Sequence, residues 1–518
     1  MPVLEVVVVL GVAVLVGHLV SRRYCIAPPV VLLGSGFVLG FIPALRRVYL
    51  PPEVVLFLFL PVLLYWESLT TSLREIRRNL RGIVMVSTLL VFVTAAAVAA
   101  AAHALGMPWG PAWVLGAAVA PTDATAVGVL ARALPRRSVT TLRAESLIND
   151  GTALVIYGLA VGITVGEEHL SAPHVGGLLL LSYGGGILAG LATAWLGIQV
   201  RRRLADPVLE NVAILLFPFT AYLLAGLAGV VVCGLIMSWA GPRIGHADQR
   251  RQTEAFWSLA MFLLNSALFI LVGLELQAAA RKLTGADLVG ALLLIAVISA
   301  MLVIVRLAFL YVAVYLIRLI DRRPQQRLRR VSNRSRVVSG LAGFRGAVSL
   351  AVALSVPAAL HSGRPFPDRN LIIFVTSGVI VMTLLQALVL PKVVRWARLP
   401  PDTSVDEERQ LAETTAVEEA FAALPRAAAD LGTPTPIIDR LRAEYETHLL
   451  VLHAGRGDTS TLRLEDDYDA LRLALLARKR ATVVRLRDER RIDDIVLRQL
   501  QARLDIDEVR LTHREFIE

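Results

Sequence analysis

The chain has 518 residues, of which 56% are hydrophobic and 18% are charged. A soluble protein of this length would carry about a quarter charged residues, so the composition excludes an ordinary soluble globular protein. The formal net charge of +11 does not call for a nucleic-acid partner, because the arginines cluster in loops between apolar segments. The two cysteines, Cys25 and Cys233, exclude a disulfide framework and a CxxC metal site.

Apolar segments of membrane-spanning length recur along the first 400 residues and predict an all-α polytopic membrane protein with about thirteen transmembrane helices. The first segment contains Glu5 in place of a basic region, so it reads as a span and not as a signal peptide. The eighth and ninth are separated only by Gly226 to Gly229, and the eleventh is long enough to tilt. The segments are 3–20, 26–43, 50–66, 82–105, 110–132, 142–163, 174–200, 208–226, 228–241, 255–275, 286–319, 338–360 and 369–397.

Alternate loops are rich in arginine, from Arg22-Arg23 to the run between Arg322 and Arg336. By the positive-inside rule the N-terminus lies outside and the C-terminus inside, which requires an odd number of spans. After Pro400-Pro401 the composition becomes charged, with apolar stripes at helical spacing. We therefore predict a transmembrane transporter domain at 1–399 and a cytoplasmic helical domain at 400–518, which is either a solvated tail or a surface for regulation or dimer contact.

The membrane region shows two polar interruptions. The fifth segment contains Pro121-Thr122-Asp123, and the twelfth contains Arg345 and Ser355-Val356-Pro357. Counting from the fifth segment to the twelfth gives an odd offset of seven, so the two segments run in opposite directions. This is the arrangement expected of inverted repeats with two broken, crossing helices and a site near the midplane.

The sixth segment carries the polar groups most unusual for a bilayer-spanning helix. Asp150 and Ser146 are four residues apart on one face, and Asn149 and Glu145 form the adjacent stripe. Oxygen ligands of this kind can replace the hydration shell of a small cation, and a carboxylate buried without a cation tends to take up a proton. The competing interpretation is a hydrogen-bond network that only joins helices.

Other buried polar residues have predicted roles too. Asp123 and Thr122 follow a proline that disrupts the helix, so freed carbonyls can join them as cation ligands. Arg345 needs a buried partner, and we expect Glu145 to be that partner in a structural ion pair. Asn265 and Arg306 are interpreted as packing contacts between helices and not as ligands.

Three motifs in this order resemble one known family. They are Pro121-Thr122-Asp123 with Ala126-Val127, Glu145-Ser146-Leu147-Ile148-Asn149-Asp150-Gly151, and Arg345-Gly346-Ala347-Val348-Ser349-Leu350. The chain resembles bacterial sodium/proton antiporters of the cation/proton antiporter 1 family over about residues 1–400. One departure is Ala124, where members often carry a second proline, which puts the geometry of that break in question.

The resemblance implies a thirteen-helix fold with dimerisation and core domains, and a homodimer. It assigns ion and proton binding to Asp150, with Asp123, Thr122 and Ser146 around it, and places Glu67 near the ion. Asp150 and Asp123 would then hold the transported monovalent cation. It implies a structural role for Glu145 and Arg345, and it associates Asn149 with electroneutral exchange.

The leading hypothesis is therefore a cell-membrane antiporter of Na+, Li+ or K+ against H+ that serves pH and sodium homeostasis, with the lipid bilayer and no nucleic acid as partner. We expect no enzymatic activity and no cofactor. The missing HExxH, P-loop and GxSxG motifs count against ATP-driven transport by this chain alone and against the familiar membrane hydrolases. The alternatives are a cation channel, a membrane sensor with a signalling tail, and a proton-coupled transporter of an organic solute. No carbonyl-filter motif such as TVGYG supports the channel.

Overall fold

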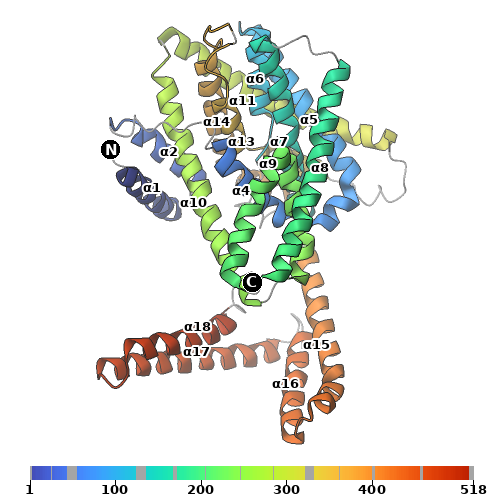
Figure 1. Cartoon of the computed structure of the whole chain (residues 1–518), viewed down its shortest axis with the longest axis vertical. Coiled ribbons are helices and arrows are strands. Elements are labelled where there is room, and N and C mark those ends of the chain that lie inside the picture. The colour runs from blue at the N-terminus through green and yellow to red at the C-terminus, as the bar shows by residue number, and fades with distance from the viewer. Residues whose placement is uncertain are drawn as a thin grey trace. The chain divides into compact units, whose positions relative to one another are not determined.

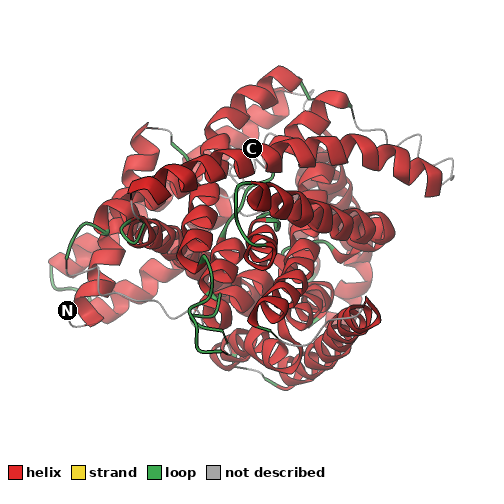
Figure 2. Cartoon of the chain, turned by 90° about the horizontal axis from the view of Figure 1, so that it is seen from above, coloured by secondary structure: helices red, strands yellow, loops and turns green. Residues whose placement is uncertain are grey.

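A computed structural model of the chain describes residues 3–24, 26–43, 55–123, 136–166, 172–204, 206–244, 247–283, 285–320, 332–360, 362–399, 403–454 and 459–512. The chain divides into two compact units, Met1–Pro401 and Asp402–Glu518. The named elements of the described ranges are helices, and these ranges contain no strand beyond an isolated bridge between Ala359 and Pro365 (Figure 2).

The first unit is a bundle of helices (Figure 1). Its described helices are α1 (Val3–Tyr24), α2 (Pro28–Leu39), η2 (Val55–Phe59), α4 (Leu60–Leu69), α5 (Leu73–Ala104), α6 (Trp109–Val119), α7 (Arg136–Val165), α8 (Ala172–Arg203), α9 (Pro207–Ala240), η4 (Gly241–Arg243), α10 (Ala247–Ala280), α11 (Gly285–Ile320), α12 (Asn333–Leu341), α13 (Ala347–Leu354) and α14 (Arg369–Ala397). Helices are expected here because lipid offers no partner for unsatisfied backbone groups.

Six described helices are long and apolar enough to cross a membrane, and five shorter apolar helices accompany them. The long ones include 31 residues of α10 and 26 residues of α11. Many aliphatic side chains point outward, among them Leu223 and Leu188, which are 84% and 70% exposed. Such an apolar surface is favourable in contact with lipid and unfavourable in contact with water, which agrees with the predicted polytopic membrane protein.

Small residues let the helices approach one another closely, as in other membrane bundles. A side chain at Gly36 of α2 would overlap the Ile270 carbonyl of α10. The sequence indicates the same role for Gly186 and Gly190. The structure confirms it, because side chains there would collide with α9.

The eighth and ninth predicted segments adjoin within one helical element, where the apolar stretches Val208–Leu224 and Ala228–Ala240 flank the predicted boundary. Helix α9 runs from Pro207 to Ala240, and Asp206 caps its start by accepting a hydrogen bond from the Val208 amide at 2.7 Å. Gly226 lies within α9 at φ +63°. A residue in the left-handed region cannot continue a straight right-handed helix, so α9 is irregular at the predicted boundary.

The twelfth predicted segment, 338–360, is not one continuous helix. Helix α12 ends at Leu341, residues 343–346 are non-helical, and α13 covers only Ala347–Leu354. The interruption lies at Gly343 to Gly346, whereas the sequence placed it at Ser355 to Pro357. Those later residues follow the C-terminus of α13, where Arg369 donates a hydrogen bond to the Val356 carbonyl at 2.9 Å.

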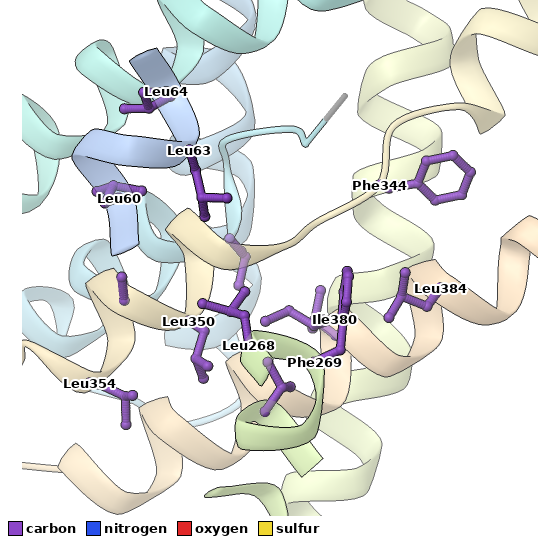
Figure 3. Packing of buried hydrophobic residues seen from close by; sticks show 14 of the residues in the cluster. Leu60, Leu63, Leu64, Leu268, Phe269, Phe344, Leu350, Leu354, Ile380 and Leu384 are labelled. Carbon is purple, nitrogen blue, oxygen red and sulfur yellow. The ribbon is translucent and has the colours of Figure 1, made fainter. Parts of the chain in front are cut away.

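A hydrophobic core fills the centre of the first unit. Figure 3 shows aliphatic and aromatic side chains meeting from α4, α10, α13 and α14, with Phe344 contributed by the non-helical segment between α12 and α13. Leu60, Ile270 and Leu350 are at most 1% exposed. This packing surrounds the two non-helical segments that carry the polar groups described below.

The second unit consists of helical hairpins. Its helices are α15 (Ser404–Leu431), α16 (Thr435–Ala454), α17 (Thr459–Asp488) and α18 (Asp494–Thr512). Helix α15 ends at Gly432, whose φ of +61° suits only glycine well, and Phe421 then stacks on Tyr445 of α16. Arg480 of α17 pairs with Asp505 and Glu508 of α18.

Candidate ion-binding site

A small cavity lies inside the first unit between α4, α7, α10, α13 and the non-helical segment after α6. Its volume is about 20 Å³. A site needs at least about 10–15 Å³ on this scale to hold a water molecule, so the cavity has room for one water or one small cation without a full hydration shell. Its polar lining consists of Glu67, Thr122, Asp123, Ser146, Asp150, Asn265 and Ser349.

The segment after α6 is non-helical for a local reason. Pro121 lacks a backbone N–H and cannot donate the next helical hydrogen bond, so α6 ends at Val119. The Asp123 amide then donates a hydrogen bond to the Phe344 carbonyl at 2.8 Å. This bond joins the segment after α6 to the one between α12 and α13.

Asp123 also lies at a helix terminus. Gly346 is the N-cap of α13, and a Cβ added to it would overlap the Asp123 Oδ2 atom. The carboxylate therefore sits at the positive end of the α13 dipole, which favours a negative group. Arg345 makes a complementary contact at the C-terminus of α6, which is the negative end of that helix dipole. Its Nε donates to the Val119 carbonyl at 3.0 Å, where a cation is favoured.

Helix α7 presents its two polar stripes as the spacing predicts. Ser146 and Asp150 both line the cavity, and they are 2% and 3% exposed. Glu145 and Asn149 are also buried but do not line it. The two stripes thus have different surroundings, one facing the cavity and one facing neighbouring helices.

Asn149 supports the cavity wall instead of lining it. In the amide orientation that satisfies both polar atoms, Oδ1 accepts from the Thr122 hydroxyl at 3.0 Å. Nδ2 then donates to the Ser87 carbonyl at 3.2 Å and to the Glu145 carbonyl at 3.1 Å. Asn149 thereby holds Thr122 in place and does not itself line the cavity.

Glu67 of α4 completes a group of three carboxylates around the cavity. Glu67 and Asp123 are close enough to Asp150 to repel it electrostatically, while Arg143 attracts Glu67. Among the described residues, Glu67 Oε1 has no hydrogen-bond partner. Buried acceptors and buried negative charges are costly unless a proton or a cation compensates them, so this cluster favours a bound cation or protonation.

The predicted ion pair between Glu145 and Arg345 is wrong. Glu145 Oε1 pairs with Arg306 Nη1 of α11 at 2.7 Å, and both side chains are at most 9% exposed. Arg345 instead donates to main-chain carbonyls, including that of Gly343 at 2.5 Å. It lies in a non-helical segment whose Gly343 carbonyl is within reach, whereas the Arg306 side chain of α11 reaches Glu145.

The comparisons identify the protein family. The model of the sodium/hydrogen exchanger transmembrane family matches residues 10–396. The chain belongs to this family. It is 45% identical to an uncharacterised Na+/H+ exchanger of Mycobacterium tuberculosis, over 98% of this chain and 96% of the relative.

Two further relatives extend the likeness. A sodium, potassium, lithium and rubidium/H+ antiporter of Bacillus pumilus is 28% identical over 75% of this exchanger and 61% of its own length. The fold is similar to that of the sodium proton antiporter MjNhaP1 from Methanocaldococcus jannaschii. That match has a TM-score of 0.56 at 19% identity and covers 76% of the exchanger and all of the neighbour.

Two lining residues of the exchanger were missed by the sequence interpretation. Asn265 was interpreted as a packing contact, but it lines the cavity from α10. Its position in the middle of an apolar segment was the available signal. Ser349, in the first turn of α13, lines the cavity with a buried hydroxyl that lacks a partner in the described ranges, and its only signal was membership of the Arg345–Leu350 motif.

The cavity presents oxygen ligands for a hard cation. No group of three His, Cys, Asp or Glu side chains in the described ranges is spaced to hold a metal ion. Carboxylate, hydroxyl and amide oxygens instead line the cavity from several elements, and such oxygens are ligands of hard cations. Ala124, where a proline was expected, lies outside the described residues.

Proposed function

We propose that the chain is a secondary active transporter that exchanges a monovalent cation for H+ across the cell membrane. The cation is Na+ in the first instance, with Li+ and K+ as further substrates. The observation that carries this proposal is a buried cavity, large enough for one small ion, that three carboxylates line inside a membrane unit. The names of the M. tuberculosis and B. pumilus relatives support it.

The exchange follows from competition for one site. Asp150 is 3% exposed, and a carboxylate so deeply buried is costly as a free anion. It holds either a proton or a cation, and each expels the other. Asp123, Thr122, Ser146 and Glu67 supply further oxygens around the cation, while Asn149 holds Thr122. Alternating access then carries whichever species is bound, so movement of one down its gradient drives the other uphill.

The rest of the transporter is proposed on the same basis. It has thirteen spans in inverted repeats with two broken, crossing helices at Pro121–Asp123 and Gly343–Gly346. The N-terminus lies outside and the helical domain at 400–518 lies in the cytoplasm. Exchange is electroneutral because Asn149 adds no charge, the working unit is a homodimer, and the process serves pH and sodium homeostasis. The family match does not favour a channel or a sensor.

Everted vesicles with a pH-sensitive dye test the proposal. Addition of Na+ should dissipate a preformed pH gradient with the wild-type chain, and Asp150→Asn should abolish this response at equal folded protein. Asp287→Asn is the matched control, because Asp287 is exposed at the start of α11. Retained exchange in Asp150→Asn would remove Asp150 from its role. Repeating the assay with Li+ and K+ in proteoliposomes defines the substrates.

A further inference from the structure

A second polar feature lies in the first unit, away from the ion cavity. A hollow of about 590 Å³ opens between the start of α12 and the end of α14. We call it the basic hollow. It is lined by Arg334, Lys392, Arg395, Trp396 and Arg398. We propose that the basic hollow binds the phosphate headgroup of an anionic phospholipid.

No carboxylate of the described residues compensates the charges of the basic hollow. Its four basic side chains are exposed, and none pairs with a carboxylate in the described part of the chain. Arg334 lies over the Trp396 ring, with its Cζ atom 5.9 Å from the ring centroid. Four cations converging from two helices repel one another, and an anion placed among them removes that repulsion while accepting several charge-assisted hydrogen bonds.

The position along α14 matches the headgroup region of a bilayer. The apolar, span-like part of α14 is Arg369–Gln386, which has 18 residues. At about 1.5 Å per residue this part covers roughly 27 Å, close to the thickness of the hydrocarbon core. Lys392 and Arg395 follow one to three turns later, where lipid headgroups begin. Tryptophan is also enriched at that depth.

The surface that leads to the basic hollow is apolar and exposed, which separates a lipid from a free anion. Leu385, Leu388 and Val389 of α14 are 39%, 43% and 56% exposed. Lys392 and Trp396 follow Val389 at intervals of three and seven residues, so they share its face of the helix. A phospholipid would lay an acyl chain along this aliphatic stripe and place its phosphate in the hollow. A soluble phosphate would contact only the basic hollow and not the aliphatic stripe.

Lipid binding to the full chain tests the inference. Native mass spectrometry measures the dissociation constant of the tightest phosphatidylglycerol adduct, with phosphatidylcholine as the uncharged comparison. Each basic residue near an anionic lipid surface contributes about a fivefold change, so Lys392→Gln with Arg395→Gln should weaken this adduct roughly 30-fold. Both side chains are exposed, so the variant should fold.

The matched control removes two positive charges elsewhere. Arg409→Gln with Arg426→Gln changes two exposed residues of α15 and should leave the dissociation constant unchanged. An unchanged constant in the Lys392/Arg395 variant would overturn the inference, as would equal affinity for phosphatidylcholine. Competition by glycerol 3-phosphate at concentrations equal to those of the lipid would assign the hollow to a soluble anion instead.

A local probe places the lipid at this hollow. Phosphatidylglycerol brominated near the top of its acyl chains should quench the fluorescence of Trp396, so Trp396→Phe should reduce the quenched fraction. Quenching that is identical in the wild type and in Trp396→Phe would place the bound lipid elsewhere on the protein and reject the site.

Discussion

The buried ion pair between Glu145 and Arg306 allows a quantitative test of how α7 is held to α11. The two charged atoms are 2.7 Å apart, and the side chains are 9% and 3% exposed. Removing one partner leaves the other charge buried and uncompensated, which typically costs about 3–5 kcal/mol. We therefore expect Glu145→Gln to lower the free energy of unfolding by about 3 kcal/mol or more, and Arg306→Met to have a similar effect.

A double-mutant cycle identifies the true partner of Glu145. The Glu145→Gln, Arg306→Met double variant should lose less stability than the sum of the single variants, with a coupling of about 2–3 kcal/mol. Arg345→Met should couple to Glu145→Gln by less, because Arg345 donates its hydrogen bonds to main-chain carbonyls. Its charge is attracted by Glu145 without direct pairing, so this coupling should be small but not zero.

The assay is denaturant unfolding of the purified full chain in one detergent, with folded yield as a second readout. Glu210 of the buried Arg201–Glu210 pair, 2.5 Å apart, is the matched control. Glu210→Gln should also destabilise the protein but should not couple to Arg306→Met. A larger coupling of Glu145 to Arg345 than to Arg306 would refute the pairing. Full stability of Glu145→Gln would refute a buried pair altogether.

Two further variants test the geometry around the ion cavity. Gly346→Ala should reduce exchange roughly tenfold or more, since a Cβ there would displace the Asp123 carboxylate. Gly11→Ala, which meets no neighbouring atom within 4 Å, should leave exchange unchanged. If Gly346→Ala exchanges at the wild-type rate, Asp123 does not need this position. Asn149→Asp places a carboxylate beside Thr122 and should make exchange respond to an imposed membrane potential. A rate that stays independent of potential would argue against control of stoichiometry by this position.

Sequence periodicity predicted well those helices whose surroundings are uniform along their length. Long apolar runs such as 286–319 became single helices, α11 in that case, because hydropathy alone requires a helix in lipid. The face shared by Ser146 and Asp150 was also predictable, since four-residue spacing on a helix is independent of what surrounds it.

The sequence interpretation was wrong where the role of a residue depends on contacts between segments that are distant in the sequence. Arg306 and Arg345 are both buried arginines, and either could satisfy Glu145 by charge alone. The choice is made by the reach of the Arg306 side chain to Glu145 and by the main-chain carbonyls that accept from Arg345, neither of which leaves a periodic signal. Asn265 was misjudged for the same reason, because a mid-helix amide looks alike whether it faces a helix or a cavity.

The interruption after α6 shows that contacts between segments can fix a geometry that the local sequence does not specify. Ala124 in place of a second proline suggested a break with less intrinsic rigidity. The structure holds this break from outside, through the Asp123 amide bonded to the Phe344 carbonyl and Arg345 bonded to the Val119 carbonyl. These two bonds orient the Asp123 carboxylate against Gly346 whether or not a proline follows. The two non-helical segments are thus joined to each other, and we expect them to act as one element of the proposed ion site.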